Sequence, residues 1–553
     1  MSDAGADQEV STSPAPSAPK SRQGGPRSPL IGWLFITPAV VLLVWQQVVP
    51  AVRTVIGSLQ HEPGGAWVGL THYQAAVDRG LPADLASGIG FGLLPAVLGF
   101  VAGFGAGRLF AGAQGGLRGA GLVLLALALL WIAPSSLMLS TTIWFGIGFS
   151  ALLVGLLTWL PASLMVGALV GAMLPPGARV RRALTFGVLI AAVAGAALGT
   201  QSLALAPTGN IPGPPAGRQY IVAFTTINMG PALAVGSALL VVAIMSGVVV
   251  TRALLASGLR LRIAPREASL AGGDHAPVTA GAADASAGGA PDQAPPGQGD
   301  TDDGPARAGV MAVVVGAAIL LVAVLASLPW LVEALRSGPA AEASWLPVWL
   351  GDGLEVLAAV VVAALAGIGI GYLRPLGDRS LPVLLTALSP LLLIGLGPLL
   401  PSHFLQGLEQ GVERLASEPG VLAWLYPHSV VVPLVFLAAY LADASHVAKQ
   451  ERVSAAPGGV MAAALGLAGV ALLILRSESS AVRLLPLPSP ERTDVVGAIQ
   501  RLDIAGMVAH LKPWPVLLLL AGVVGLCAAG IRRLRIHTPG AQPRPERKAT
   551  AGN

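Results

Sequence analysis

Charged side chains are scarce in this chain of 553 residues. Only 11% of the residues are Asp, Glu, Lys or Arg, whereas 54% are hydrophobic. A soluble domain carries about 25% charged residues, so this composition excludes a soluble globular protein and predicts a chain with many membrane crossings. The formal net charge of +5 fits the basic cytoplasmic loops of such a protein, and we therefore expect no nucleic-acid partner.

Cysteine is nearly absent, because Cys527 is the only one in the chain. This excludes an intrachain disulfide and a metal cluster built on cysteines. The sequence also lacks a Gly-x-x-x-x-Gly-Lys-Ser/Thr loop, a zincin pattern and a Gly-x-Ser-x-Gly elbow. We therefore predict that this chain is not an enzyme and has no catalytic residue, no metal and no cofactor of its own.

Titratable side chains are almost missing from the centres of the apolar runs. Glu333, Asp352 and Glu355 lie near the ends of such runs. A proton-coupled transporter normally needs buried acidic or histidine side chains at mid-membrane. Their absence argues against that class and favours an energy source on another polypeptide.

Twelve apolar runs are present, and a run of about 20 apolar residues spans a bilayer as a helix. The predicted fold class is therefore an all-α polytopic membrane protein with two six-helix halves. Most of the 33 Lys and Arg residues fall in segments that place both termini in the cytoplasm. The runs lie near residues 30–52, 85–107, 119–145, 149–174, 183–206 and 229–251, and near 309–332, 354–373, 381–400, 421–442, 457–475 and 514–531.

Composition divides the chain into five parts. Residues 1–28 form a disordered cytoplasmic tail rich in Ser, Pro and Gly, and residues 261–307 form a flexible Ala/Gly/Pro/Asp-rich cytoplasmic linker. The two six-helix halves are 29–260 and 308–535, and a basic cytoplasmic tail follows at 536–553. A duplicated membrane unit predicts a pseudo-two-fold transporter with its pathway between the halves, although unrelated twelve-span proteins can also divide six and six.

Two segments of the first half resemble the sugar-type (maltose/glycerol-phosphate class) permeases of ABC importers. One is an apolar helix with two prolines and the loop after it, and the other is a Pro/Gly-rich outer loop leading into the sixth run. Residues 319–332 are similar, more weakly, to the start of the second permease type. The matching residues are Leu34, Phe35, Pro38, Ala39, Leu42, Leu43, Pro50, Trp67, Val68, Gly69, Leu70 and Tyr73, then Thr208, Gly209, Pro212, Gly213, Tyr220, Ile221, Ala223, Phe224, Gly230, Ala232, Ala234 and Ser237.

The resemblance implies two permease halves fused in one chain, with ATP bound by a separate ABC ATPase subunit. It also implies an extracytoplasmic solute-binding protein as a partner. In each half, the family couples to its ATPase through an acidic-Ala-Ala-to-Gly (EAA) loop between the fourth and fifth helices. Here residues 174–184 lack the acidic-Ala-Ala part and residues 440–457 lack the glycine, so the coupling loops are degenerate or are ordinary basic loops. The coupling candidates are Gly177, Arg179, Arg181, Arg182, Asp443, Lys449 and Arg452.

A path for a sugar needs hydrogen-bonding side chains within the membrane-spanning helices. Side chains of this type more often bond to their own helix or bridge two helices, which is the alternative interpretation. The substrate-path candidates are Gln46, Gln47, Ser135, Ser136, Thr141, Thr142, Thr386 and Ser389.

From the sequence we expect a multi-pass protein of a bacterial cytoplasmic (inner) membrane, in contact with lipid. Its expected function is the permease component of a binding-protein-dependent ABC importer for a sugar or similar small polar solute. The alternative is a permease-derived scaffold, a structural subunit of a larger complex that has lost ATP coupling. A third possibility is an unrelated twelve-span exporter.

Overall fold

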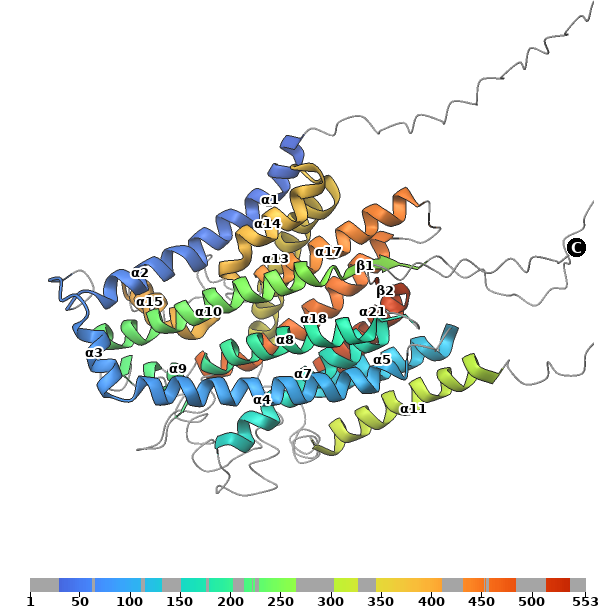
Figure 1. The fold of residues 1–553 in the computed structure, drawn as a ribbon, viewed down its shortest axis with the longest axis horizontal. Helices are drawn as coiled ribbons and strands as arrows, with labels where there is room; N and C mark the ends of the chain where they lie inside the picture. The colour runs from blue at the N-terminus through green and yellow to red at the C-terminus, as the bar shows by residue number, and fades with distance from the viewer. Residues whose placement is uncertain are drawn as a thin grey trace, which may run out of the picture.

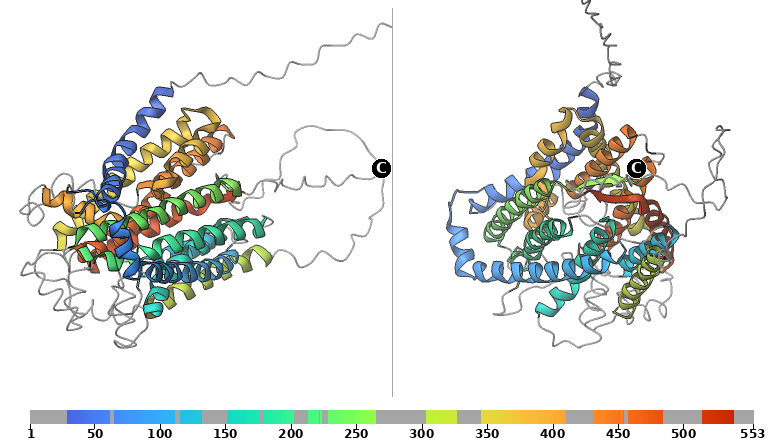
Figure 2. Two further views of the ribbon diagram at one scale, coloured as in Figure 1. Left: turned by 60° about the vertical axis from the view of Figure 1, so that its left-hand side comes forward. Right: turned by 45° about the vertical axis from the view of Figure 1, so that its right-hand side comes forward.

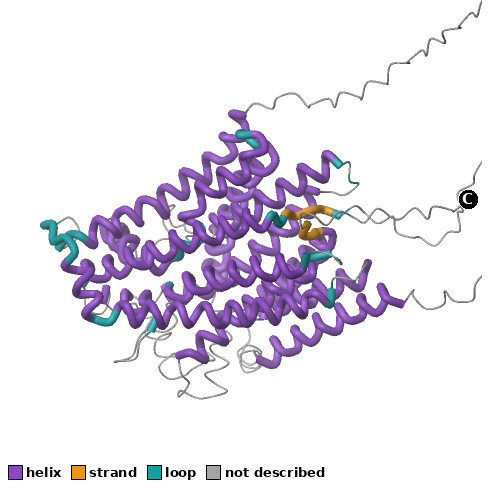
Figure 3. The backbone as a smooth tube through the Cα atoms, in the orientation of Figure 1, coloured by secondary structure: helices purple, strands orange, loops and turns teal. Residues whose placement is uncertain are grey.

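The protein is described by a computed structural model that covers residues 29–61, 65–110, 115–131, 151–175, 179–201, 213–220, 222–223, 228–264, 303–326, 345–409, 431–451, 453, 457–483 and 514–537. Long helices lie side by side along roughly one direction, and one small sheet of two strands lies at one end of the bundle (Figures 1 and 3). The chain reaches that end several times, so residues far apart in the sequence meet there.

The helices of the first half begin with one continuous rod. Its parts are α1 (Pro29–Leu43), the π-helix η1 (Val44–Val48) and α2 (Val49–Ser58). The rest of this half contains α3 (Thr71–Asp78), α4 (Leu81–Arg108), α5 (Gly115–Trp131), α7 (Ala151–Met173), α8 (Val180–Thr200), α9 (Pro215–Tyr220) and α10 (Met229–Ser257), followed by strand β1 (Arg260–Ile263).

The second half contains helices that are interrupted more often. They are α11 (Asp303–Ala326), α13 (Trp345–Gly367) with its π-helical extension η3 (Ile368–Leu373), η4 (Gly377–Arg379), α14 (Ser380–Leu388), η5 (Ser389–Leu391), α15 (Leu396–Glu409), α17 (Val431–Gln450), α18 (Pro457–Arg483), α21 (Trp514–Gly530) and η7 (Ile531–Arg533). Strand β2 (Leu534–His537) follows η7.

Six helical segments in the described part of the chain are long and apolar enough to cross a membrane: 29–58, 81–108, 180–200, 229–257, 353–373 and 431–450. Four shorter apolar helices accompany them, at 116–128, 163–173, 309–321 and 457–473. The protein is therefore an all-α membrane protein with several spans, as the composition predicted. The number twelve and the cytoplasmic location of both termini stay predictions.

Several observed helices extend beyond the predicted runs, and the two runs at 381–400 and 457–475 show the differences most clearly. The run at 381–400 is broken, because α14 ends at Leu388 and α15 starts only at Leu396. Pro390 lies in this break, and its missing backbone N–H removes a helical hydrogen bond. The run at 457–475 is longer than predicted, since α18 continues to Arg483.

Glycines bring neighbouring helices into backbone contact. A Cβ atom on Gly103 of α4 would lie 1.8 Å from the carbonyl oxygen of Leu164 on α7. In the second half, a Cβ atom on Gly371 of η3 would lie 2.2 Å from the carbonyl oxygen of Ala439 on α17. Small residues at such crossings are typical of helix packing in lipid, where van der Waals contact rather than exclusion of water drives association.

The contacts between helices follow the same pattern in the two halves. Helix α4 packs against α7 and α8, and α13 packs in the same way against α17 and α18. Across the halves, α2 and α10 both pack against α15, while α11 and α21 both pack against α5 (Figure 2). Each half therefore places its first and last long helices on the third helix of the other half.

The largest apolar cluster also joins the halves. Ile36 and Leu43 of α1 belong to the same buried cluster as Ala363 of α13, Ile370 of η3 and Val435 of α17. The first helix of the chain is thus packed on helices that follow it by more than 300 residues.

The two strands repeat one tetrapeptide. Arg-Leu-Arg-Ile occurs at 260–263 and again at 533–536. The strands pair antiparallel, with Arg262 opposite Arg535, Leu261 opposite Ile536 and Ile263 opposite Leu534. If the two strands exchange places, each of these three pairs is replaced by a pair of the same residue types. A local two-fold axis therefore passes through the Arg262–Arg535 pair. We call β1 and β2 together the Arg-Leu-Arg-Ile ribbon.

Candidate functional site

The end of the bundle with the ribbon gathers the described coupling candidates. Arg179, Arg181 and Arg182 lie at the start of α8, and Asp443 and Lys449 lie in the last turns of α17. Gly177 and Arg452 fall outside the described residues. Strand β1 packs against α17 and strand β2 against α7, so the ribbon connects the fourth helix of each half (Figure 1).

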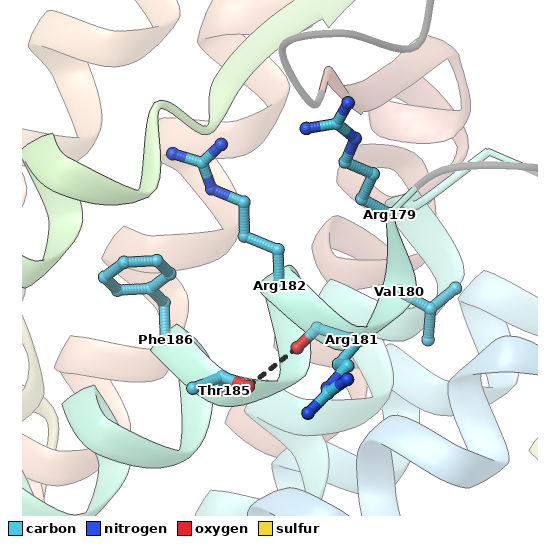
Figure 4. A pocket seen from close by; sticks show the side chains of 6 residues that line it. All are labelled: Arg179, Val180, Arg181, Arg182, Thr185 and Phe186. Carbon is cyan, nitrogen blue, oxygen red and sulfur yellow. Dashed lines mark hydrogen bonds between the residues drawn. The ribbon is translucent and has the colours of Figure 1, made fainter.

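The start of α8 forms a pocket of about 550 Å³, which we call the arginine pocket. The Arg182 guanidinium donates from Nη2 to the Ala256 carbonyl oxygen at 2.9 Å and lies 5.9 Å from the centre of the Phe186 ring. Figure 4 shows Arg179 and Arg182 pointing to the same side of α8, with Arg181 pointing elsewhere. The lining residues are Arg179, Val180, Arg181, Arg182, Thr185 and Phe186.

The end of η3 is tied to α17 by an arginine. Arg374 has a left-handed backbone conformation, with φ of 49°, and follows η3 directly. Its Nη2 donates to Asp443 at 2.5 Å, its Nη1 donates to Asp378 at 3.0 Å, and its Nε donates to the Gly371 carbonyl oxygen at 3.1 Å. Asp443 is buried and Asp378 is exposed, so the Asp443 contact is the one protected from water.

Lys449 also fixes α17 to η3. Its Nζ donates to the Tyr372 hydroxyl at 3.1 Å, and His446 contacts the same Tyr372 ring edge-on, with ring centres 5.4 Å apart. Ser445 donates back to the Leu441 carbonyl oxygen of its own helix at 2.8 Å. The expected coupling loop at 440–457 is thus mostly the continuous end of α17, whose polar side chains contact η3 or their own helix.

Two arginines that the sequence analysis did not single out play the same part in the first half. Arg108 donates from Nη1 to the Leu174 carbonyl oxygen at 2.8 Å, and Arg118 donates from Nη2 to the Ala172 carbonyl oxygen at 3.0 Å. Both cap carbonyl groups at the end of α7, where a cation also complements the helix dipole. In the sequence, the signal that could have identified both arginines was a basic residue at the boundary of an apolar run.

The connections that should hold the coupling helices are short in both halves. Six residues, 174–179, separate α7 from α8, and six residues, 451–456, separate α17 from α18. A helical pair of the EAA type needs more chain than this. Both connections are therefore short, and the degeneracy of the coupling loops stays a prediction.

The ribbon has one basic and one apolar face, because side chains alternate along a strand. Arg260, Arg262, Arg535 and His537 share one face, and Arg262 forms an ion pair with Glu451 at 3.7 Å. Burial lowers the pKa of His537 below its usual 6.5, and the neighbouring Arg262 and Arg260 lower it further. The opposite face is buried in the bundle and consists of Leu261, Ile263, Leu534 and Ile536.

The structure separates the substrate-path candidates. Gln46 and Gln47 are both buried in η1. Thr386 donates to the Pro382 carbonyl oxygen and Ser389 to the Thr386 carbonyl oxygen, each at 2.7 Å, so both bond to their own segment, as the alternative interpretation held. The remaining candidates, Ser135, Ser136, Thr141 and Thr142, fall outside the described residues.

Other polar side chains join the halves. Gln201 donates from Nε2 to the Leu393 carbonyl oxygen at 2.9 Å and accepts from the Gly395 N–H at 2.6 Å. The hydroxyl groups of Thr54 and Ser402 are also in contact. Gln201 thereby satisfies the backbone groups freed by the break between α14 and α15. Its position directly after α8 was the only sequence signal.

The opposite end of the bundle holds a buried ion pair. Asp84, in the first turn of α4, has no solvent exposure and pairs with Arg218 of α9. The Gly213 N–H donates to the same carboxylate at 3.3 Å. Both partners of Asp84 lie within five residues of each other in the chain, and the ion pair fixes α9 to α4.

Comparison of the chain with known protein families, curated proteins and solved structures finds no match. Within the described ranges, no group of three His, Cys, Asp or Glu side chains lies close enough together to hold a metal ion. The fold and the site define the class as a multi-span helical membrane protein with a basic end organised around the ribbon.

Proposed function

We propose that this chain is the permease component of a binding-protein-dependent ABC importer in a bacterial cytoplasmic (inner) membrane. Its two halves form the pathway, a separate ATPase supplies the energy, and an extracytoplasmic solute-binding protein delivers a sugar or similar small polar solute. The observation that carries the proposal is the matching packing of the two halves, in which first and last helices lie on the third helix of the other half. The exchange-symmetric ribbon supports the same arrangement.

Charge supports twelve spans with both termini in the cytoplasm. Five described arginines lie toward the end opposite the ribbon, and the basic residues at the ribbon end outnumber them. These five are Arg53, Arg79, Arg218, Arg476 and Arg483. Cytoplasmic loops carry the excess of Lys and Arg in membrane proteins, so the ribbon end faces the cytoplasm. The described arginines at that end are Arg108, Arg118, Arg179, Arg181, Arg182, Arg252, Arg260, Arg262, Arg307, Arg374, Arg379, Arg532, Arg533 and Arg535.

The pathway lies between the halves, where polar groups line an otherwise apolar contact. Gln201 binds backbone groups of the other half, and Gln46 and Gln47 occupy a π-helix in the first rod. π-helical turns inside α-helices are frequent at functional sites. A solute that exchanges hydrogen bonds with amide groups could move along this contact.

Co-purification from the native membrane tests the proposal. A tagged full-length chain in mild detergent should bring down a chain with a Walker A loop and vanadate-sensitive ATP hydrolysis. Arg181→Glu, on the ribbon end, should reduce the recovered ATPase, whereas Arg79→Glu, which changes another exposed arginine at the other end, should not. Purification without any ATPase contradicts the proposal.

A second candidate function is the permease-derived scaffold that has lost ATP coupling. The six-residue connections 174–179 and 451–456 favour it, since they are shorter than a helical pair of the EAA type. Under this alternative the same purification yields a stoichiometric membrane partner without ATP hydrolysis, and neither arginine variant changes its recovery.

A further inference from the structure

Three polar side chains of the first half meet one short stretch of the second half, residues 393–402. They are Gln201, Gln219 and Thr54, and their partners are the backbone groups of Leu393 and Gly395, the Pro398 carbonyl oxygen and the Ser402 hydroxyl, respectively. Helix α15 and its neighbours α2 and α9 lie toward the end of the bundle opposite the ribbon (Figure 1). The contact between the halves is therefore polar in this region, although it is deeply buried.

Gln219 of α9 has a hydrogen-bond acceptor that nothing in the protein uses. The residue is 1% exposed, and its Nε2 donates to the Pro398 carbonyl oxygen at 3.5 Å. A carbonyl oxygen only accepts, so the amide N–H must face Pro398, and the buried Oε1 is left without a partner. A Cβ atom on Gly236 would lie 2.6 Å from this Nε2, so glycine makes room for the amide. A buried acceptor without a donor lowers stability and calls for an explanation.

The hydroxyl groups around Gln219 have no proton left to donate to a ligand. Thr54 donates to the Pro50 carbonyl oxygen at 2.8 Å, and Ser237 donates to the Leu233 carbonyl oxygen at 2.9 Å. Ser402 contacts the Thr54 hydroxyl, whose proton is already used, so Ser402 is the donor in that contact. A hydroxyl has one proton and two lone pairs, and only lone pairs remain here. We call Thr54, Gln219, Ser237 and Ser402 the acceptor cluster.

The acceptor cluster also has no charged member. Arg218 is next to Gln219 in α9, but it forms an ion pair with the buried Asp84, so these two charges cancel. An ammonium or metal cation at the cluster would be a buried charge without a carboxylate to balance it. A phosphate or carboxylate offers only acceptors, which cannot bond to the lone pairs of the cluster. The group that fits is uncharged and carries several O–H donors.

We propose that the acceptor cluster binds the transported solute and that this solute is an uncharged polyhydroxy compound. Its hydroxyl groups donate to Gln219 Oε1 and to the oxygens of Thr54, Ser237 and Ser402 as the halves move apart. Phosphorylated, carboxylated and ammonium-bearing solutes are rejected because the cluster neither donates to an anion nor balances a cation. The route past the cluster rests on the proposed importer function, whereas the identity of the binding residues and the neutrality of the ligand are new.

Saturation-transfer NMR on the purified full-length chain in neutral detergent tests this. The probes are glycerol, glucose, glucose 6-phosphate and glucosamine in its ammonium form, which vary charge on related polyols. We expect the two neutral probes to bind and the two charged probes to bind more weakly. Gln219→Leu should weaken glucose binding about tenfold, because it removes one hydrogen-bond acceptor. Without ligand, this variant should unfold at or above the wild-type temperature, because the unpaired acceptor is gone.

The matched control is Gln74→Leu, which removes an exposed glutamine of α3 and should keep the wild-type affinity for glucose. The proposal is overturned if neither neutral probe binds or if Gln219→Leu keeps the wild-type affinity. A lower unfolding temperature of Gln219→Leu overturns it as well, since Gln219 would then serve helix packing. Equal binding of glucose and glucose 6-phosphate contradicts the selection for neutral ligands. Stabilisation by sodium rather than potassium chloride, without glucose binding, assigns the cluster to a cation.

Co-purification of an ATPase tests the importer function separately. An ATPase recovered with a chain that binds no polyol leaves the importer in place and removes the acceptor cluster as its solute site. Glucose binding that depends on Gln219, without any ATPase, retains the site and removes the importer. The two failures are thus distinguishable.

Discussion

Arg374 and Asp443 form an ion pair that closes the end of η3 onto α17, with Nη2 and Oδ1 2.5 Å apart. The arginine keeps a left-handed backbone conformation, which costs a residue with a side chain on the order of 1 kcal/mol. The buried Asp443 carboxylate stabilises that conformation, because without the guanidinium it would be an unpaired charge. The contact thus couples a strained turn to the packing of two helices.

Asp443→Asn should destabilise the protein by about 3 kcal/mol, because it leaves the Arg374 guanidinium beside a neutral buried group. Thermal unfolding in detergent should show a transition several degrees lower. Asp378→Asn removes an exposed partner of the same guanidinium and should leave the transition within error. Equal losses of stability in the two variants would show that the burial of Asp443 contributes nothing to the free energy of unfolding.

Gly103→Ala should separate α4 from α7, since its Cβ would lie 1.8 Å from the Leu164 carbonyl oxygen. We expect a loss of about 2 kcal/mol or more, as for an overpacked core. Gly105→Ala is the control on the same helix, because nothing lies within 4 Å of its Cβ position. A similar unfolding temperature for the two variants contradicts this packing.

Arg262→Cys and Arg535→Cys should form a disulfide under mild oxidation in a Cys527→Ser background. Directly paired residues of antiparallel strands have Cα separations within the range that a disulfide bridges. With a protease site inserted into residues 264–302, the two halves should stay linked on a non-reducing gel. Arg252→Cys with Arg535→Cys, which are not paired, should yield separate fragments; a linked product only with this second pair would refute the register.

Acidification should loosen the ribbon. The pKa of His537 lies below its usual 6.5, so the folded ribbon favours the neutral imidazole. Below about pH 6.5 the open state takes up the proton first, and stability falls as the pH falls. Amide hydrogen exchange at 260–263 and 534–537, corrected for intrinsic rates, should rise between pH 7.5 and 5.5. His537→Gln should flatten this dependence and His61→Gln should not; a pH-independent wild type contradicts the assignment.

Composition was sufficient to predict the membrane class, because burial in lipid excludes charge along whole helices. Periodicity and length placed most helices, but they could not place the break between α14 and α15. That break depends on Gln201, a residue almost 200 positions away, which satisfies the freed backbone groups. The π-helical turns η1 and η3 likewise have no local pattern in the sequence.

The sequence predicted which types of residue occur at the candidate site more reliably than it predicted what those residues do. Arg179, Arg181 and Arg182 do form a basic cluster, yet Asp443 and Lys449 serve helix packing rather than a loop. The ribbon was missed, although Arg-Leu-Arg-Ile is legible twice in the sequence. A tetrapeptide repeated 273 positions later (261 to 534) carries too little information to be noticed before the strands are seen to pair.

The ribbon also sets an order of events during synthesis. Strand β1 leaves the ribosome 273 residues before its partner (534 minus 261), a wait of roughly 15–50 s at ordinary elongation rates. During that wait it is an unpaired edge, and the charge of Arg260 and Arg262 discourages strands of other nascent chains from joining it. Strand β2, the later of the two strands to be translated, therefore completes the ribbon after the rest of the bundle has been made.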